Sequence, residues 1–106
     1  MIEYISTYIL MPNFEWDEVK DRSNIEKHLI SFDEAITIFD GDVLTEVDHR
    51  GDYGEDRFLS VGKMDSDIGR VVIVVAHTER VEKTRIISAR RANRKERKRY
   101  NEFVQA

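Results

Sequence analysis

Apolar and polar residues alternate with a period that changes along the chain, and the change predicts an α+β fold. Asp17 is a suitable N-cap for a charged helix that runs to about His28. Ser31 and Glu34 have the spacing of a capping box, in which two side chains satisfy free backbone donors. Apolar residues then recur at helical spacing up to Asp40-Gly41-Asp42 (Phe32, Ala35, Ile36 and Phe39). Two helices are therefore expected, the second packed against a core.

From Val43 onward the pattern is typical of strands. Strands are predicted at residues 43–47, 57–63, 71–76 and 85–88, with a Gly- and Asp-rich loop at 48–56. The continuous apolar run from Val71 to Ala76 indicates a central strand covered on both faces. Because the connections are short, the four strands are expected to form an antiparallel meander. Residues 2–16 could begin a further, N-terminal strand, with an interruption at Pro12-Asn13.

The last predicted element is a strongly basic helix. Asn93 and Glu96 repeat the capping-box spacing and open a helix that reaches about Phe103. Residues 90–99 carry seven Lys or Arg and one Glu, so the other 96 residues hold a charge of −10 in a chain whose net charge is −4. This asymmetry is compatible with a specific site for a polyanion. It is equally compatible with a solvated helix whose cations complement its own C-terminal dipole.

Composition restricts the class of protein further. The 106 residues suit one domain (1–106), and the absence of cysteine excludes disulfides, thiol catalysis and thiolate metal sites. No signal-peptide pattern and no run long enough to span a bilayer are present, so a cytoplasmic protein without a membrane partner is expected. His49 lies near three aspartates, but their spacing matches no metal-binding loop and favours an acidic turn. No metal and no cofactor are predicted.

Residues suited to phosphate chemistry gather around the last two predicted strands. His77, Glu79 and Arg80 follow the central strand, while Arg85, Arg90 and Arg91 flank the next one. Cleaving RNA without a metal needs a base for the 2′-hydroxyl, cations for the phosphorane and an acid for the leaving oxygen. These residue types are present. Two structural alternatives remain open: Glu79 could pair with Arg80 or Arg85 on the surface, and His77 could be a buried structural residue.

Ordered motifs over about residues 14–102 resemble the BrnT family. They include FEWD at 14–17, Lys20, Asn24, Lys27-His28, SFDEA at 31–35, EDRF at 55–58, Gly62, VVIVV at 71–75, HTER at 77–80 and RIISARRA at 85–92, followed by Arg94, Glu96, Arg97 and Tyr100. BrnT proteins are toxins of type II toxin–antitoxin pairs with a fold similar to RelE-like ribonucleases. The resemblance implies an endoribonuclease that blocks translation by cutting RNA, free or on the ribosome.

The resemblance also implies partners. A BrnA-like antitoxin would neutralise the toxin, join two copies of it through an antitoxin dimer in a 2:2 complex, and alone contact operator DNA.

The resemblance assigns residue roles as well. Arg57, Arg80 and Arg90 would handle phosphate, and Glu79 and His77 would transfer protons, with Lys27 and His28 as second choices. A further set would bind RNA (Lys27, His28, Arg91, Arg94 and Arg97). Arg94, Arg97 and Arg99 could bind either RNA or an acidic segment of the antitoxin. Phe14 and Trp16 are interpreted as core anchors rather than base-stacking platforms.

Two features depart from the family pattern. Leu29 stands where glycine is common, which can alter the turn between the first two helices, and residues 1–13 extend beyond the usual start. The competing hypothesis is a protein-interaction module without catalysis that acts with the antitoxin in operon autoregulation. A third hypothesis, a DNA-binding regulator acting through the basic helix, predicts steeply salt-dependent binding to duplex DNA.

Overall fold

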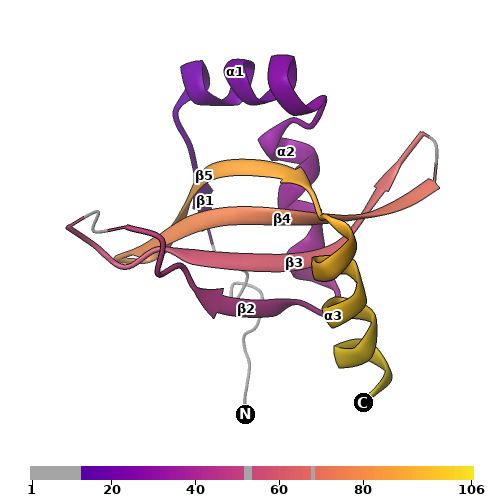
Figure 1. The fold of residues 1–106 in the computed structure, drawn as a ribbon. Coiled ribbons are helices and arrows are strands. Elements are labelled where there is room, and N and C mark those ends of the chain that lie inside the picture. The colour runs from indigo at the N-terminus through magenta and orange to yellow at the C-terminus, as the bar shows by residue number, and fades with distance from the viewer. Residues whose placement is uncertain (1–12, 52–53, 68) are drawn as a thin grey trace, which may run out of the picture.

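The computed structural model describes residues 13–51, 54–67 and 69–106, which form one five-stranded sheet with helices on both faces (Figure 1). The strands are β1 (Asn13–Glu15), β2 (Leu44–Val47), β3 (Phe58–Ser66), β4 (Gly69–Arg80) and β5 (Lys83–Arg91). The helices are α1 (Glu18–His28), α2 (Phe32–Ala35), the 3-10 helix η1 (Ile36–Asp40) and α3 (Arg94–Gln105). The strand order is β1-β5-β4-β3-β2, and β2 to β5 pair antiparallel. The predicted α+β class and the four-stranded meander are confirmed.

The N-terminal strand is shorter than the sequence suggested. β1 has three residues and pairs in parallel with residues 83–85 of β5. Asn13, expected to interrupt a strand, is instead its first residue. The remainder of the predicted strand, residues 2–12, lies outside the described residues.

All three predicted helix starts are confirmed by their caps. The Asp17 carboxylate accepts from the backbone N–H of Val19 at 2.7 Å. Both capping boxes are present, Ser31 with Glu34 and Asn93 with Glu96. Each cap satisfies backbone donors that a helix start leaves open, and a single cap typically stabilises a helix by about 1 kcal/mol.

The second predicted helix tightens after one turn. α2 continues directly into η1, so the chain winds with about three residues per turn there. The fully buried positions are consequently Phe32, Ala35 and Ile38, spaced by three, whereas Ile36 and Phe39 are only partly buried. The sequence pattern predicted the burial of Phe32 and Ala35 correctly, but it included Ile36 and Phe39, and not Ile38, in the apolar stripe.

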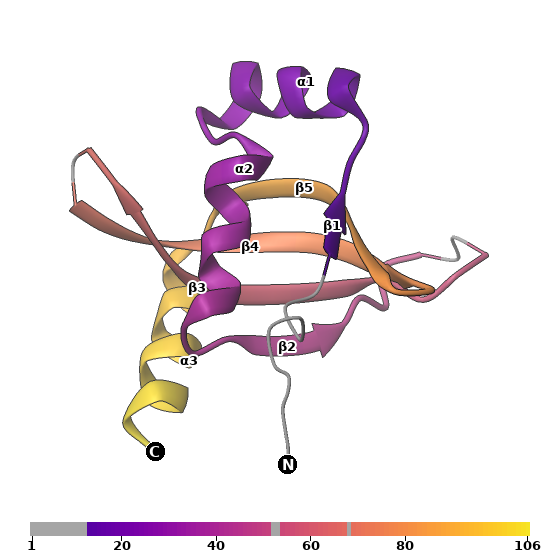
Figure 2. The ribbon, with the colours of Figure 1, turned by 180° about the vertical axis from the view of Figure 1, so that it is seen from behind.

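The sheet has two differently covered faces. On the α2 face, Ile73, Val75 and Ala89 pack with residues of α2 and η1. On the α3 face, Val61 and Val74 pack with Ala92 and Tyr100. Figures 1 and 2, which view the sheet from opposite sides, show α2 and η1 crossing the middle of one face and α3 lying at one end of the other. Among the described elements, no helix lies over the remainder of the α3 face.

Gly62 sets how closely η1 approaches the sheet. A Cβ atom at this position would lie 2.8 Å from Cβ of Ile38, nearer than side-chain carbons approach one another. Glycine therefore lets η1 rest directly on β3 and buries Ile38. Phe14 and Trp16 pack against the same core, Phe14 stacking on Phe39 and Trp16 meeting Phe32 edge-on. Their interpretation as core anchors is confirmed.

The Asn24 side chain attaches α1 to the outer edge of β5. Its amide nitrogen donates to the carbonyls of Ile30 and Ala89 at 2.9 and 2.8 Å, and its oxygen accepts from Ala89 N–H at 3.1 Å. A buried backbone group without a partner costs about 1–3 kcal/mol. Asn24 thus replaces a strand along the part of the β5 edge that β1 does not reach. Figure 1 shows α1 running along this edge.

None of the helices in the described part of the chain is both long and apolar enough to cross a membrane.

Leu29 adopts the left-handed backbone conformation that ends α1, with φ 60° and ψ 29°. Its side chain is 82% exposed, so packing returns little of the roughly 1–2 kcal/mol that this conformation costs a residue with a Cβ. The turn keeps the shape that glycine would favour, and the leucine adds backbone strain rather than a new turn.

We therefore expect Leu29→Gly to raise the free energy of unfolding by about 0.5–1 kcal/mol in urea titrations. The matched control is Val19→Gly, at an exposed position inside α1, which should lower it by about the same amount. If both substitutions destabilise the protein equally, Leu29 is not strained.

Candidate nucleic-acid interface

All three arginines predicted to handle phosphate lie on the α3 face. Arg90 pairs across the strands with Val74, whose side chain belongs to the α3-face core. Arg80 is six residues beyond Val74 on β4, and Arg57 directly precedes Phe58, which faces the other way with His77. Because side chains alternate along a strand and cross-strand partners share a face, all three point to the α3 side. Thr78, on the same side, is fully buried, and its hydroxyl has no hydrogen-bond partner among the described residues.

Arg90 is held at the start of α3. Its two terminal nitrogens donate to the two carboxylate oxygens of Glu96 at 2.8 and 2.9 Å. Glu96 also accepts from Asn93 N–H at 2.8 Å, so one carboxylate caps the helix and orients the arginine. These hydrogen bonds raise the pKa of Arg90 and lower the pKa of Glu96, against the opposing effect of burial on each. The pair is charged and preorganised, with a third of the Arg90 side chain exposed.

A second arginine corner lies in the loop between β2 and β3. The buried Asp48 carboxylate accepts from Nε and Nη2 of Arg50 at 2.8 and 2.9 Å. The hydrogen bond from Arg50 is the main reason that the pKa of Asp48 falls to about 2, and the charge of Arg57 contributes as well. The charge of Arg50 also acts on Arg90 and Glu96. Arg50 is therefore near enough to the Arg90–Glu96 pair for its charge to act on it, and Arg57 is near enough to act on Asp48.

The two proton-transfer candidates His77 and Glu79 lie on the opposite, α2 face. His77 Nδ1 lies 2.9 Å from a Glu79 oxygen, and His77 Nε2 lies 2.7 Å from the hydroxyl of Ser60. The Glu79 carboxylate also accepts from the Thr84 hydroxyl at 3.0 Å. The imidazole is 4% exposed and packs between the rings of Phe39 and Phe58. Burial lowers its pKa, and Glu79 only partly opposes that shift.

The arginines near the β4–β5 turn do not pair with Glu79. Arg80 lies 3.4 Å from Glu55 in the preceding loop. Arg85 donates to Glu15 of β1 at 3.0 Å. The surface salt bridges that the sequence suggested for Glu79 are therefore wrong in their partners, because the antiparallel register places Glu79 opposite Thr84 and puts the arginines on the other face.

None of the five residues predicted to bind RNA forms an ion pair with a described carboxylate (Lys27, His28, Arg91, Arg94 and Arg97). Lys27 and His28 end α1, and both are exposed. Arg91 and Arg94 flank the junction of β5 and α3. Arg97 donates to the carbonyl of Ala92 at 2.9 Å. A phosphate could engage these cations without first breaking a salt bridge to the described part of the chain.

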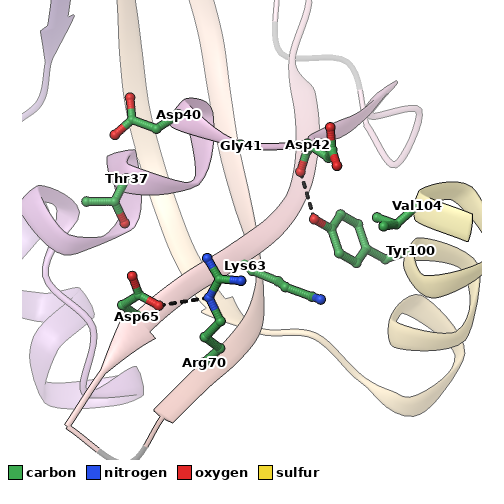
Figure 3. A pocket seen from close by; sticks show the side chains of 9 residues that line it. All are labelled: Thr37, Asp40, Gly41, Asp42, Lys63, Asp65, Arg70, Tyr100 and Val104. Carbon is green, nitrogen blue, oxygen red and sulfur yellow. Dashed lines mark hydrogen bonds and ion pairs between the residues drawn. The ribbon is translucent and has the colours of Figure 1, made fainter.

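A cavity of about 550 Å³, lined by none of the predicted RNA-binding residues, lies between the end of η1, the β3–β4 hairpin and α3 (Figure 3). Asp40, Asp42 and Asp65 outnumber the two cations in its lining, Lys63 and Arg70, and Arg70 is paired with Asp65. The Tyr100 hydroxyl donates to the Asp42 carbonyl at 2.8 Å, and burial raises the pKa of this phenol. The acidic lining disfavours a polyanion, so this cavity is not the candidate interface.

No group of three or more metal-ligating side chains occurs among the residues that the structure describes. Asp48, one of the aspartates near His49, holds Arg50 instead.

The structure thus divides the predicted catalytic set between two faces, and the roles themselves stay predictions. Arg57, Arg80 and Arg90 share the α3 face, whereas the buried His77 and the half-exposed Glu79 are hydrogen-bonded to each other on the opposite face. Sequence reasoning missed Arg50 and Ser88. Arg50 lies in a loop without a motif, and Ser88 shares the α3 face with Arg90 only through the strand register.

One comparison with known proteins identifies a family. The model for "Ribonuclease toxin, BrnT, of type II toxin-antitoxin system" matches residues 16–96, well over half of the chain. In a separate comparison, no curated protein sequence matches the chain.

The lowered pKa of His77 predicts how stability depends on pH. The folded protein keeps a neutral imidazole, whereas the unfolded chain takes up a proton below the ordinary pKa of 6.5. The contribution of His77 to the free energy of unfolding should be complete above pH 6.5, and it should decrease as the pH falls toward the lower pKa of the folded state. Urea titrations at pH 7.5 and 5.5 should show His77→Gln losing less stability, relative to wild type, at the lower pH. Val75→Ala, a core substitution without a titratable group, should cost the same at both values; equal pH behaviour of the two variants would contradict the assignment.

Proposed function

The chain belongs to the BrnT family of ribonuclease toxins from type II toxin–antitoxin systems, and we propose that it cleaves RNA on the α3 face without a metal ion. The observation that carries this proposal is that Arg57, Arg80 and Arg90 share a sheet face that α3 covers only at one end. Arginine suits this task because its planar, permanently charged group binds two phosphate oxygens at once.

In the proposed reaction, the 2′-oxygen of a ribose attacks the adjacent phosphorus and the bond to the 5′-oxygen breaks. A base takes the 2′-hydroxyl proton, an acid protonates the 5′-oxygen, and the product is a 2′,3′-cyclic phosphate. Arg57 and Arg90 stabilise the extra negative charge of the phosphorane. Arg80, paired with Glu55 at the edge of the same face, is a more distant phosphate ligand.

For proton transfer, the geometry favours His28 over His77. His28 is exposed at the end of α1, and it lines a groove together with Ser88, which shares the α3 face with Arg90. His77 is enclosed by Ser60, Glu79 and two phenylalanine rings on the other face. We therefore propose that His77 and Glu79 act as positioning residues, which fix the β4–β5 hairpin that carries the arginines.

The family implies an antitoxin partner. We propose that this partner is BrnA-like, that its dimer joins two toxins in a 2:2 complex, and that operator DNA is contacted through it. Inhibition of translation in the cytoplasm would follow from cleavage of RNA, on or off the ribosome.

The decisive assay is cleavage of single-stranded RNA by the purified chain in the presence of EDTA, with product ends identified as 2′,3′-cyclic phosphates. Arg57→Ala and Arg90→Ala should each lower kcat/KM by roughly 10²–10³-fold, as the loss of one transition-state donor usually does. Lys98→Ala removes an exposed cation of α3 that pairs with Glu102, and it should change the rate less than about twofold. Thermal unfolding of each variant separates lost chemistry from lost fold.

The ion pairs of Arg80 and Arg90 favour a competing role, because carboxylates already occupy two of the arginines proposed to bind phosphate. A chain of this kind could serve only as an interaction module with the antitoxin. Intact RNA after incubation with the wild-type chain, with and without ribosomes and at low salt, would favour that role and exclude the ribonuclease.

A further inference from the structure

A groove of about 240 Å³ separates α1 from the outer edge of β5. Its described lining is basic and polar and contains no carboxylate (Lys20, Ser23, Asn24, Lys27, His28, Ile87 and Ser88). Three other cavities of the described surface each include acidic side chains, such as Asp42, Asp48 and Glu46. In a protein with a net charge of −4, this α1–β5 groove is a place where an anion meets cations alone.

The cations of the groove are not engaged by the acidic groups that the structure describes. No ion pair joins Lys20, Lys27 or His28 to a described residue, although carboxylates pair with most arginines of the sheet. Lys27 and His28 lie in the last turn of α1, where a cation complements the helix dipole. Lys20 lies in the first turn, where the same dipole disfavours a cation. The helix alone therefore does not explain why lysines occupy both ends of the groove.

The walls of the groove are fixed before any ligand arrives. The Asn24 amide is fully engaged by Ile30 and Ala89, so it forms a rigid floor. Ile87 is the extra residue of a β-bulge, since Ala76 pairs with Ser88 and His77 with Ile86. Bulges redirect neighbouring side chains and are frequent beside functional sites. Here the bulge allows two successive residues, Ile87 and Ser88, to line the same groove.

We propose that the α1–β5 groove binds one phosphate of single-stranded RNA, beside the phosphate that Arg90 contacts. Lys20 and Lys27 supply the charge, and the Ser88 hydroxyl donates a hydrogen bond. Ser88 and Arg90 are two residues apart on one face of β5, about 7 Å along the strand. This separation is comparable to that of successive phosphates in an RNA strand. The inference rests on the proposed function, because it assigns the second phosphate to the same substrate.

The test measures binding rather than cleavage. Fluorescence anisotropy with a short 2′-O-methyl RNA, which cannot be cleaved through the 2′-oxygen, gives affinity and its salt dependence. Lys20→Ala combined with Lys27→Ala should weaken binding about tenfold or more, and it should reduce the slope of log K against log salt by about 0.7 for each phosphate that the protein no longer neutralises. The matched control is Lys63→Ala with Lys98→Ala, which removes the same charge elsewhere and should change the affinity less than about threefold.

A second readout locates the anion. Titration of the wild-type chain with inorganic phosphate, followed by amide NMR, should shift the signals of Lys27, Ile87 and Ser88 and leave those of Lys63 and Asp65 unchanged. Equal loss of RNA affinity in the two double variants, or phosphate shifts spread over the whole surface, would overturn the proposal. Loss of antitoxin binding with unchanged RNA affinity would also overturn it and assign the groove to the protein partner.

These outcomes remain distinct from a failure of the proposed function. If the wild-type chain binds 2′-O-methyl RNA through the groove but leaves ordinary RNA intact, the groove stands and the ribonuclease falls. If RNA is cut normally by the Lys20 and Lys27 double variant, with unchanged KM, the ribonuclease stands and the groove falls.

Discussion

The hydrogen bonds between Asn24 and the backbone of Ala89 are the interaction on which the candidate interface depends. β1 pairs with only three residues of β5, so the rest of that edge would present open backbone donors and acceptors. One buried amide satisfies both polar groups of Ala89 and also holds the carbonyl of Ile30 at the entry to α2. α1 is thereby fixed along the sheet edge, although its own apolar stripe is weak. Together with the hydrogen bond from Phe32 N–H to Asp21 at 2.8 Å, this contact places the basic residues of α1 beside Ile87 and Ser88 of β5.

Charge pairing then divides the sheet into two functional sides. On the α2 face, the buried residues His77, Ser60 and Thr84 are joined to the half-exposed Glu79 in a chain of hydrogen bonds. Such a network is costly unless it is satisfied, and here it fixes the strands that carry the arginines. On the α3 face, carboxylates orient Arg50 and Arg90 without neutralising the region, because no described carboxylate pairs with the groove cations of α1. One surface can therefore offer rigid arginines to the reacting phosphate and accessible lysines to the adjacent phosphate of the same RNA strand.

Local sequence signals were sufficient to predict the helices and strands, but not to predict on which face of the sheet each side chain lies. Asp17, Ser31 and Asn93 begin helices because capping depends on neighbours only two or three residues away. The separation of His77 from Arg57 and Arg90 follows from strand alternation, and the pairing of Arg85 with Glu15 follows from the parallel strand β1. These contacts join residues as much as 70 positions apart, so no short pattern contains them. Leu29 shows the same limit, because the sequence did not indicate the left-handed backbone conformation that this residue adopts.

The most direct test is to measure amide hydrogen exchange of the chain with and without bound 2′-O-methyl RNA. The central claim is that RNA lies across the α3 face and the α1 edge, with the acidic cavity beside Tyr100 left empty. Added protection should appear in peptides covering residues 18–29 and 84–91, and around Arg57. Unchanged exchange is expected at residues 63–66 and 69–71 of the β3–β4 hairpin. Protection at that hairpin, with none along α1 and β5, would contradict the account.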